Sequence, residues 1–112
     1  MPPETQRLAL LKLLERNPNF SQRELARAMG VSLGKTNYCL KAMVEKGFVK
    51  LGKFCQNKNK QAYAYLLTPS GVEEKARIVR GFLQRKEAEY EAIQNEIEAL
   101  RGDLLDSTLG IS

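Results

Sequence analysis

The most constraining feature of this sequence is the stretch SQRELARAMGVSLGKTNYCLKAMVEK, which begins at Ser21. Ser21 followed three residues later by Glu24 forms a capping box, a pattern that starts helices by satisfying two backbone N–H groups. Gly30 is suited to end that helix, because glycine enters the left-handed conformation at little cost. Ser32 can then cap a second helix, which Gly47 would end in turn. Two short helices joined by so tight a turn predict a helix-turn-helix.

The second predicted helix, residues 32–46, has an inward and an outward face. Small and apolar residues recur at steps of three and four, at Thr36, Cys39, Leu40 and Met43, and we expect these side chains to enter the core. The opposite face is nearly free of acids and carries groups of the kinds that contact base edges and phosphates. An ordinary helical hairpin whose polar face meets only water is the alternative. We call the outward residues the reading face: Ser32, Leu33, Lys35, Asn37, Tyr38 and Lys41.

Charge is distributed unevenly along the 112 residues, whose net charge is +5. Residues 1–60 contain 12 Lys or Arg against 4 Asp or Glu, a balance of +8, whereas residues 61–112 contain 6 against 9, a balance of −3. This segregation predicts a nucleic-acid-binding module joined to a segment that does not touch nucleic acid. No apolar run is long enough to cross a membrane, and the first residues lack a signal-peptide pattern. We therefore expect a cytoplasmic protein with no membrane contact.

A polar, basic segment between two short alternating runs follows the helix-turn-helix. FVKLGK precedes it and AYAYLLT follows it, a pattern that predicts a β-hairpin. A helix-turn-helix followed by a basic-tipped hairpin is a winged helix, whose wing, here residues 52–61, can reach phosphates or a minor groove. A solvated polar turn is the alternative. The wing lysines are Lys53, Lys58 and Lys60, and Arg23 in the first helix of the motif completes the predicted DNA-binding set.

A long helix is predicted after Thr68, which can cap it, and Pro69, which suits its first position. Apolar and aromatic residues recur along it at alternating steps of four and three, the pattern of a coiled coil. So small a domain cannot cover such a helix, and we expect its distal half to pair with a second copy. The predicted domains are a winged helix-turn-helix at 1–68, a dimerisation helix at 69–106 and a disordered tail at 107–112. The dimer contacts, called the seam residues below, are Leu83, Lys86, Tyr90, Ile93, Ile97, Leu100 and Leu104.

The charge pattern of this helix favours one direction of pairing. Residues 73–86 carry a balance of +3 and residues 87–106 a balance of −6. A parallel pair would place like charges side by side, whereas an antiparallel pair places basic residues beside acidic ones. Each exposed ion pair contributes only about 0.2–1 kcal/mol, so the direction depends on the sum. We expect an antiparallel homodimer.

Several other kinds of site are not supported. GVSLGKT resembles a phosphate loop, but Gly30 and Gly34 are separated by three residues rather than the required four. Histidine is absent, and two cysteines are too few for a disulfide framework or a zinc site. We therefore expect no enzyme activity, no cofactor and no metal. Cys39 is expected in the core, and Cys55 on the wing leaves thiol-based regulation open.

In the order of its elements the chain resembles the winged-helix MarR family of bacterial transcriptional regulators. SQRELARAMGVS, LKAMVEKGFVK and YAYLLTPSG carry the resemblance, and they are most similar to a subgroup associated with exopolysaccharide gene clusters. The resemblance implies a homodimer on a pseudo-palindromic operator, with helix 32–46 in the major groove. The wing tip QNKNKQ differs from the Asp-x-Arg-Arg-like tip of the family. Few residues precede the first helix, so we do not expect a small-molecule effector.

The sequence thus predicts a mainly α fold with a small β-hairpin, in which a winged helix-turn-helix precedes a long coiled-coil helix. The expected function is sequence-specific binding of double-stranded DNA by a homodimeric transcriptional regulator. An architectural protein that coats or bridges DNA with little sequence preference is the first alternative. A winged helix that docks other proteins and binds no DNA is the second.

Overall fold

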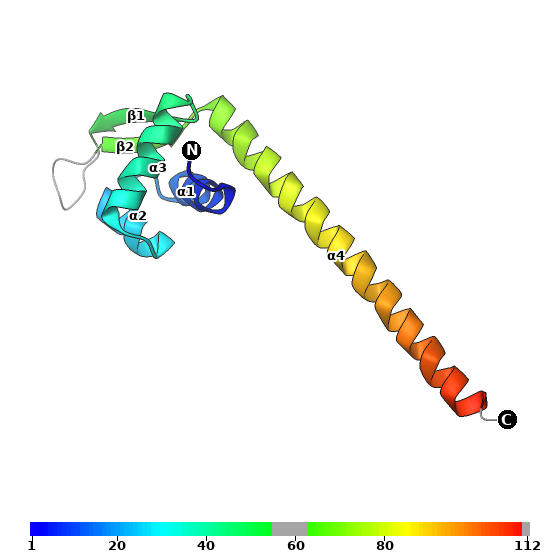
Figure 1. Cartoon of the computed structure of the whole chain (residues 1–112). Helices are drawn as coiled ribbons and strands as arrows, with labels where there is room; N and C mark the ends of the chain where they lie inside the picture. The colour runs from blue at the N-terminus through cyan, green and yellow to red at the C-terminus, as the bar shows by residue number, and fades with distance from the viewer. Residues whose placement is uncertain (55–62, 111–112) are drawn as a thin grey trace. The chain divides into compact units, whose positions relative to one another are not determined.

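The computed structural model describes residues 1–54 and 63–110 of the chain. The elements follow the predicted order, with helices before and after a single hairpin (Figure 1). The mainly α fold with a small antiparallel hairpin and a long C-terminal helix is confirmed. The elements are α1 (Glu4–Arg16), α2 (Gln22–Met29), α3 (Leu33–Glu45), β1 (Val49–Phe54), β2 (Tyr63–Leu67) and α4 (Pro69–Leu109).

The chain divides into two compact units, Met1–Val79 and Arg80–Ser112, and the boundary falls inside α4. The first unit holds the apolar core, to which every helix of the unit contributes. Burial of these aliphatic side chains is the main favourable term in folding a domain of this size. The fully buried large side chains include Leu10, Leu11 and Leu14 of α1, Leu25 of α2, Met43 of α3, Val49 of β1 and Ile78 of α4.

Helix α2 begins and ends as the sequence predicts. The Ser21 hydroxyl accepts a hydrogen bond from the Glu24 N–H at 3.1 Å, and the Ser21 N–H donates to the Glu24 carboxylate at 3.0 Å. Gly30 has a φ of 69°, in the left-handed region. The next N–H, that of Val31, donates to the Ala26 carbonyl at 3.1 Å and closes the last turn of α2. The chain therefore leaves α2 in a fixed direction.

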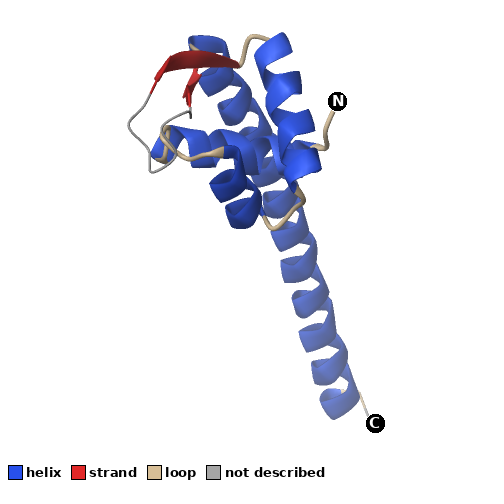
Figure 2. Cartoon of the chain, turned by 90° about the vertical axis from the view of Figure 1, so that its left-hand side faces the viewer, coloured by secondary structure: helices blue, strands red, loops and turns tan. Residues whose placement is uncertain are grey.

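The turn after α3 leads directly into the hairpin. Gly47 has a φ of 77°, and the Phe48 N–H donates to the Met43 carbonyl at 2.9 Å. β1 and β2 then pair antiparallel, with Val49 opposite Leu67, and the register is irregular between Leu51 and Phe54. Figure 2 shows the two strands beside the helices of the first unit.

Helix α4 begins against this turn. The Thr68 hydroxyl accepts from the Gly71 N–H at 3.0 Å and itself donates to the Gly47 carbonyl, so the predicted cap is present. A Cβ atom at Gly71 would stand 2.0 Å from the Phe48 carbonyl oxygen, so this position accommodates only glycine. The helix continues to Leu109, and residues 107–109 are helical where the sequence suggested a tail. Residues 111 and 112 lie outside the described part of the chain.

An ion cluster joins α1 to the first turns of α4. The Glu74 carboxylate is only 9% exposed and accepts hydrogen bonds from Arg77 at 2.6 Å and from Arg7 at 3.3 Å. Glu4 lies 3.5 Å from Arg77 and extends the cluster. The hydrogen bond from Arg77, opposed in part by burial, lowers the pKa of Glu74 below its ordinary value. The part of α4 up to Val79 is thus held to the rest of the first unit by ion pairs as well as by the burial of Ile78.

Candidate nucleic-acid interface

Helix α3 has the two faces that its sequence predicts. The inward residues Thr36, Cys39, Leu40 and Met43 are each at most 2% exposed. The Thr36 hydroxyl donates to the Ser32 carbonyl at 3.0 Å, so this buried polar group is satisfied. The core therefore fixes the rotation of α3 about its axis and determines which residues face outward.

The reading face is exposed along α3. Ser32, Lys35, Leu33, Tyr38 and Lys41 are exposed, and Asn37 is half-buried. The Ser32 hydroxyl accepts from the Lys35 N–H at 3.1 Å and thereby caps the helix, so this side chain has a structural role in addition to any contact. The Tyr38 hydroxyl accepts a hydrogen bond from the amino group of Met1 at 3.2 Å.

The predicted wing is described only at its base. Lys53 belongs to β1, but its side chain is not described, and Lys58, Lys60 and Cys55 lie outside the described residues. Arg23 is exposed in the first turn of α2. The structure thus brings together the six residues of the reading face and leaves the wing contacts as predictions.

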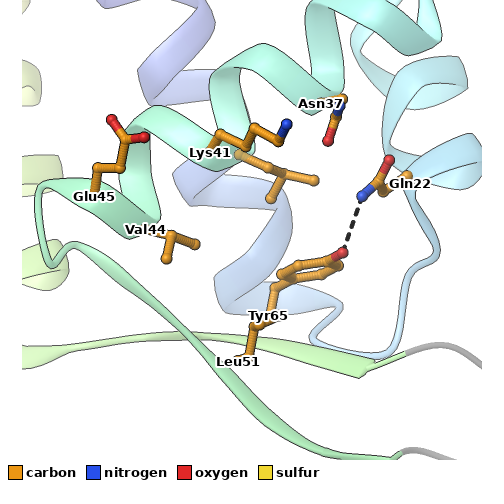
Figure 3. Close-up of a pocket in the computed structure, with 8 residues that line it drawn as sticks. Gln22, Asn37, Lys41, Val44, Glu45, Leu51 and Tyr65 are labelled. Atoms are coloured by element: carbon orange, nitrogen blue, oxygen red, sulfur yellow. Dashed lines mark hydrogen bonds between the residues drawn. The ribbon is translucent and has the colours of Figure 1, made fainter.

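A hollow of about 450 Å³ lies between α3, the start of α2 and the two strands (Figure 3). Its apolar part consists of Leu40, Val44 and Leu51, and two members of the reading face, Asn37 and Lys41, line it as well. We call it the α3–hairpin hollow. It extends the reading face towards the hairpin.

Three polar residues of the hollow, Gln22, Glu45 and Tyr65, were not identified as site residues from the sequence. Gln22 and Tyr65 stand at one end of it, where the Gln22 side-chain amide donates to the Tyr65 hydroxyl at 3.1 Å (Figure 3). Glu45 stands at the other end, beyond Val44. The sequence suggested a reading face almost free of acids, and Glu45 adds one carboxylate to its border. The sequence does contain a signal for Glu45. It follows Lys41 by four residues, so the two side chains lie on the same side of α3.

The thiol of α3, Cys39, is buried. Burial raises the pKa of the Cys39 thiol to about 11, although the charge of Arg7 opposes this rise, so the thiol stays protonated at neutral pH. No three His, Cys, Asp or Glu side chains in the described part of the chain are placed to hold a metal ion. Among these same residues, no helix is both long and apolar enough to cross a membrane.

The second unit, considered by itself, presents the seam residues to solvent. Its six apolar or aromatic seam side chains are between 42% and 69% exposed in the single chain. Lys86, the remaining one, forms an ion pair with Glu89 at 3.2 Å along the same helix. The Tyr90 hydroxyl accepts from the Gln94 side-chain amide at 3.0 Å. Such a stripe of large apolar side chains is unusual on a helix that stays in water.

Comparison with known proteins places the fold. Residues 4–50 match a family model described as winged helix-turn-helix DNA-binding. No curated protein matches the chain in sequence.

Solved structures of bacterial regulators are similar to this chain. CouR, a transcriptional repressor bound to a 23-mer DNA duplex, matches with a TM-score of 0.63 and 21% identity over 90% of this chain and 71% of that one. MepR, a transcription regulator of the Staphylococcus aureus multidrug efflux pump MepA, matches with a TM-score of 0.63 and 15% identity over 96% and 78%. A MarR/EmrR family transcriptional regulator from Acinetobacter sp. ADP1 matches with a TM-score of 0.58 and 18% identity over 88% and 73%. At these identities the likeness shows a shared fold.

Proposed function

We propose that this protein is a MarR-type transcriptional regulator that binds a specific DNA sequence as a homodimer in the bacterial cytoplasm. The observation that carries the proposal is the exposed face of α3, where Lys35, Asn37 and Lys41 stand on a helix whose rotation the core fixes. The match of residues 4–50 to a DNA-binding winged helix-turn-helix and the fold shared with a DNA-bound repressor support it. Catalysis has no part in this proposal, and neither does a small-molecule effector.

In the proposed complex α3 lies in the major groove. Asn37, Lys35, Lys41 and Tyr38 meet base edges and provide sequence preference, because each base pair presents a distinct pattern of donors and acceptors there. Arg23 and the wing lysines meet phosphates and provide affinity that does not depend on sequence. The wing lysines are Lys53, Lys58 and Lys60.

The homodimer in this proposal forms through the seam residues. Pairing two copies covers the exposed apolar stripe of the second unit, and charge favours the antiparallel arrangement, since residues 73–86 are basic and residues 87–106 acidic. To test direction, Leu100→Cys would be introduced into a variant with Cys39→Ala and Cys55→Ser. Two such chains should crosslink poorly at position 100, and efficient crosslinking would establish a parallel pair.

A binding-site selection from a random duplex pool tests the proposed function. We expect an enriched pseudo-palindrome whose half-sites are separated by one helical turn or a multiple of it, about 34 Å. The selected site should bind at least about 10³-fold more tightly than random DNA at physiological salt. A ratio below about 10 would identify an architectural protein instead. Absence of any salt-dependent DNA affinity would contradict both.

The resemblance to the exopolysaccharide-associated subgroup leads to a further proposal about the operators. SQRELARAMGVS and YAYLLTPSG are similar to the exopolysaccharide-associated subgroup, so we propose operators within an exopolysaccharide gene cluster. Crosslinking of the protein to chromosomal DNA in the source bacterium, followed by sequencing, should recover such a cluster. Recovery of unrelated promoters alone would remove the subgroup assignment and leave the DNA-binding function unaffected.

A further inference from the structure

The α3–hairpin hollow contains two hydrogen-bonded side chains, Gln22 and Tyr65, that do not belong to the reading face. Gln22 is the first residue of α2, and Tyr65 belongs to β2, so their side chains come from elements far apart in the chain. The Gln22 amide donates to the Tyr65 hydroxyl at 3.1 Å (Figure 3). A phenol that accepts in this way keeps its own O–H proton for a further acceptor.

Hydrogen bonds hold Tyr65 both at its backbone and at its hydroxyl. The Tyr65 N–H donates to the Pro18 carbonyl at 3.3 Å, and its backbone pairs with Leu51 of β1. Both Gln22 and Tyr65 are half-buried, which restricts their rotamers while leaving the hydroxyl within reach of the hollow. A donor held in this way binds an acceptor with little further loss of side-chain entropy.

The rest of the hollow indicates which acceptor fits. Asn37 and Lys41 belong both to the hollow and to the reading face, so a DNA strand that follows α3 would continue into this space. Val44 and Leu51 form an apolar surface against which a deoxyribose can pack. Glu45 stands at the end opposite Gln22 and Tyr65 and would repel a phosphate there (Figure 3). An anionic group is therefore favoured at the Gln22–Tyr65 end alone.

We propose that Tyr65, held by Gln22, donates a hydrogen bond to one backbone phosphate of the DNA strand that passes between α3 and the hairpin. This inference rests on the proposed function and adds two binding residues to it. Tyr and Gln are among the side chains that donate to phosphate oxygens in DNA complexes, and such contacts fix the register of the protein. The pair would thus hold α3 at a defined depth in the groove.

The variant Tyr65→Phe removes the donor and keeps the ring. We expect its affinity to fall about three- to tenfold on the selected operator and on random duplex alike, as for the loss of one hydrogen bond. The slope of log K against log salt should stay unchanged, because no cation is removed. Thr108→Val, which removes a hydroxyl near the end of α4 that donates only to the Leu104 carbonyl, is the control, and it should bind DNA as the wild type does.

A scan of single methylphosphonate substitutions along the operator separates contact from structure. At one phosphate of each half-site the wild type should lose affinity, and Tyr65→Phe should lose nothing further. Loss of affinity in Tyr65→Phe without such a position would mean that the pair only supports the fold, and a lowered melting temperature would accompany it. Unchanged binding by Tyr65→Phe also overturns the inference, while the proposed function stands. If the wild type itself binds no DNA, the proposed function fails first.

Discussion

The amide of Asn37 can bind an adenine edge through two hydrogen bonds, donating to N7 and accepting from the N6 amino group. Replacing it by alanine should cost about 1–3 kcal/mol on the selected operator and little on random duplex. Gel-shift or fluorescence titrations on the two DNAs would measure this difference. Asn95→Ala, in the second unit, should leave both affinities unchanged. Equal losses on both DNAs would assign Asn37 to the backbone.

Glu45 borders the reading face without an ion pair among the described residues. Its carboxylate therefore opposes the approach of phosphates, and Glu45→Gln should raise affinity about two- to fivefold on operator and random DNA alike, most clearly at low salt. Glu98→Gln on α4 serves as the control for a change in net charge alone. A loss of affinity in Glu45→Gln would mean that the carboxylate accepts a hydrogen bond from a base.

At the level of residues, the sequence predicts best what depends on near neighbours. The Ser21–Glu24 box and the inward rotation of α3 follow from spacing within a single helix. The bond between Gln22 and Tyr65 joins positions 43 residues apart, and no periodicity connects them. Their meeting depends on how β2 packs beside α2, which is a property of the tertiary fold.

The ion cluster at the start of α4 makes stability depend on pH. The folded-state pKa of Glu74 lies below its ordinary value of 4.5, so its contribution is present above pH 4.5 and declines as pH falls through the lowered pKa. At pH 7 the variant Glu74→Gln should unfold with a free energy about 1–3 kcal/mol lower than the wild type. Urea titrations of the two proteins should show this gap narrowing below pH 4.5. A gap that stays constant down to about pH 3 would contradict the role given to the charge.

At the level of elements, local signals set the boundaries and distant contacts modify them. Thr68 and Pro69 predict the start of α4, because a cap depends only on adjacent residues. The sequence does not reveal that Arg7 of α1 reaches Glu74, since either charge could equally have faced water. The wing tip, including Lys58 and Lys60, lies outside the described residues, so its role stays a prediction.

For the whole molecule, the proposed dimer sets the salt dependence of binding. With about four cations per protomer on phosphates, the slope of log K against log salt should be near −7 for the dimer and about half of that for a monomer. Ile93→Asp places an acid in the seam and should give a monomer with the smaller slope. Ala92→Asp adds the same charge beside the seam and should keep the dimer. Sedimentation and binding titrations would measure both, and a dimeric Ile93→Asp protein would relocate the interface.

The first turns of α4 belong to the first unit, because Ile78 is 1% exposed there and Glu74 pairs with Arg7. A minimal fragment that contains the first unit must therefore extend to Val79. A fragment that ends at residue 68 would lose Ile78 from its core and Glu74 from Arg7, which would keep only its longer ion pair with Glu4 at 3.9 Å. We expect the longer fragment to melt cooperatively and the shorter one to be degraded. In limited proteolysis of the intact chain, cleavage within α4 should fall after Val79.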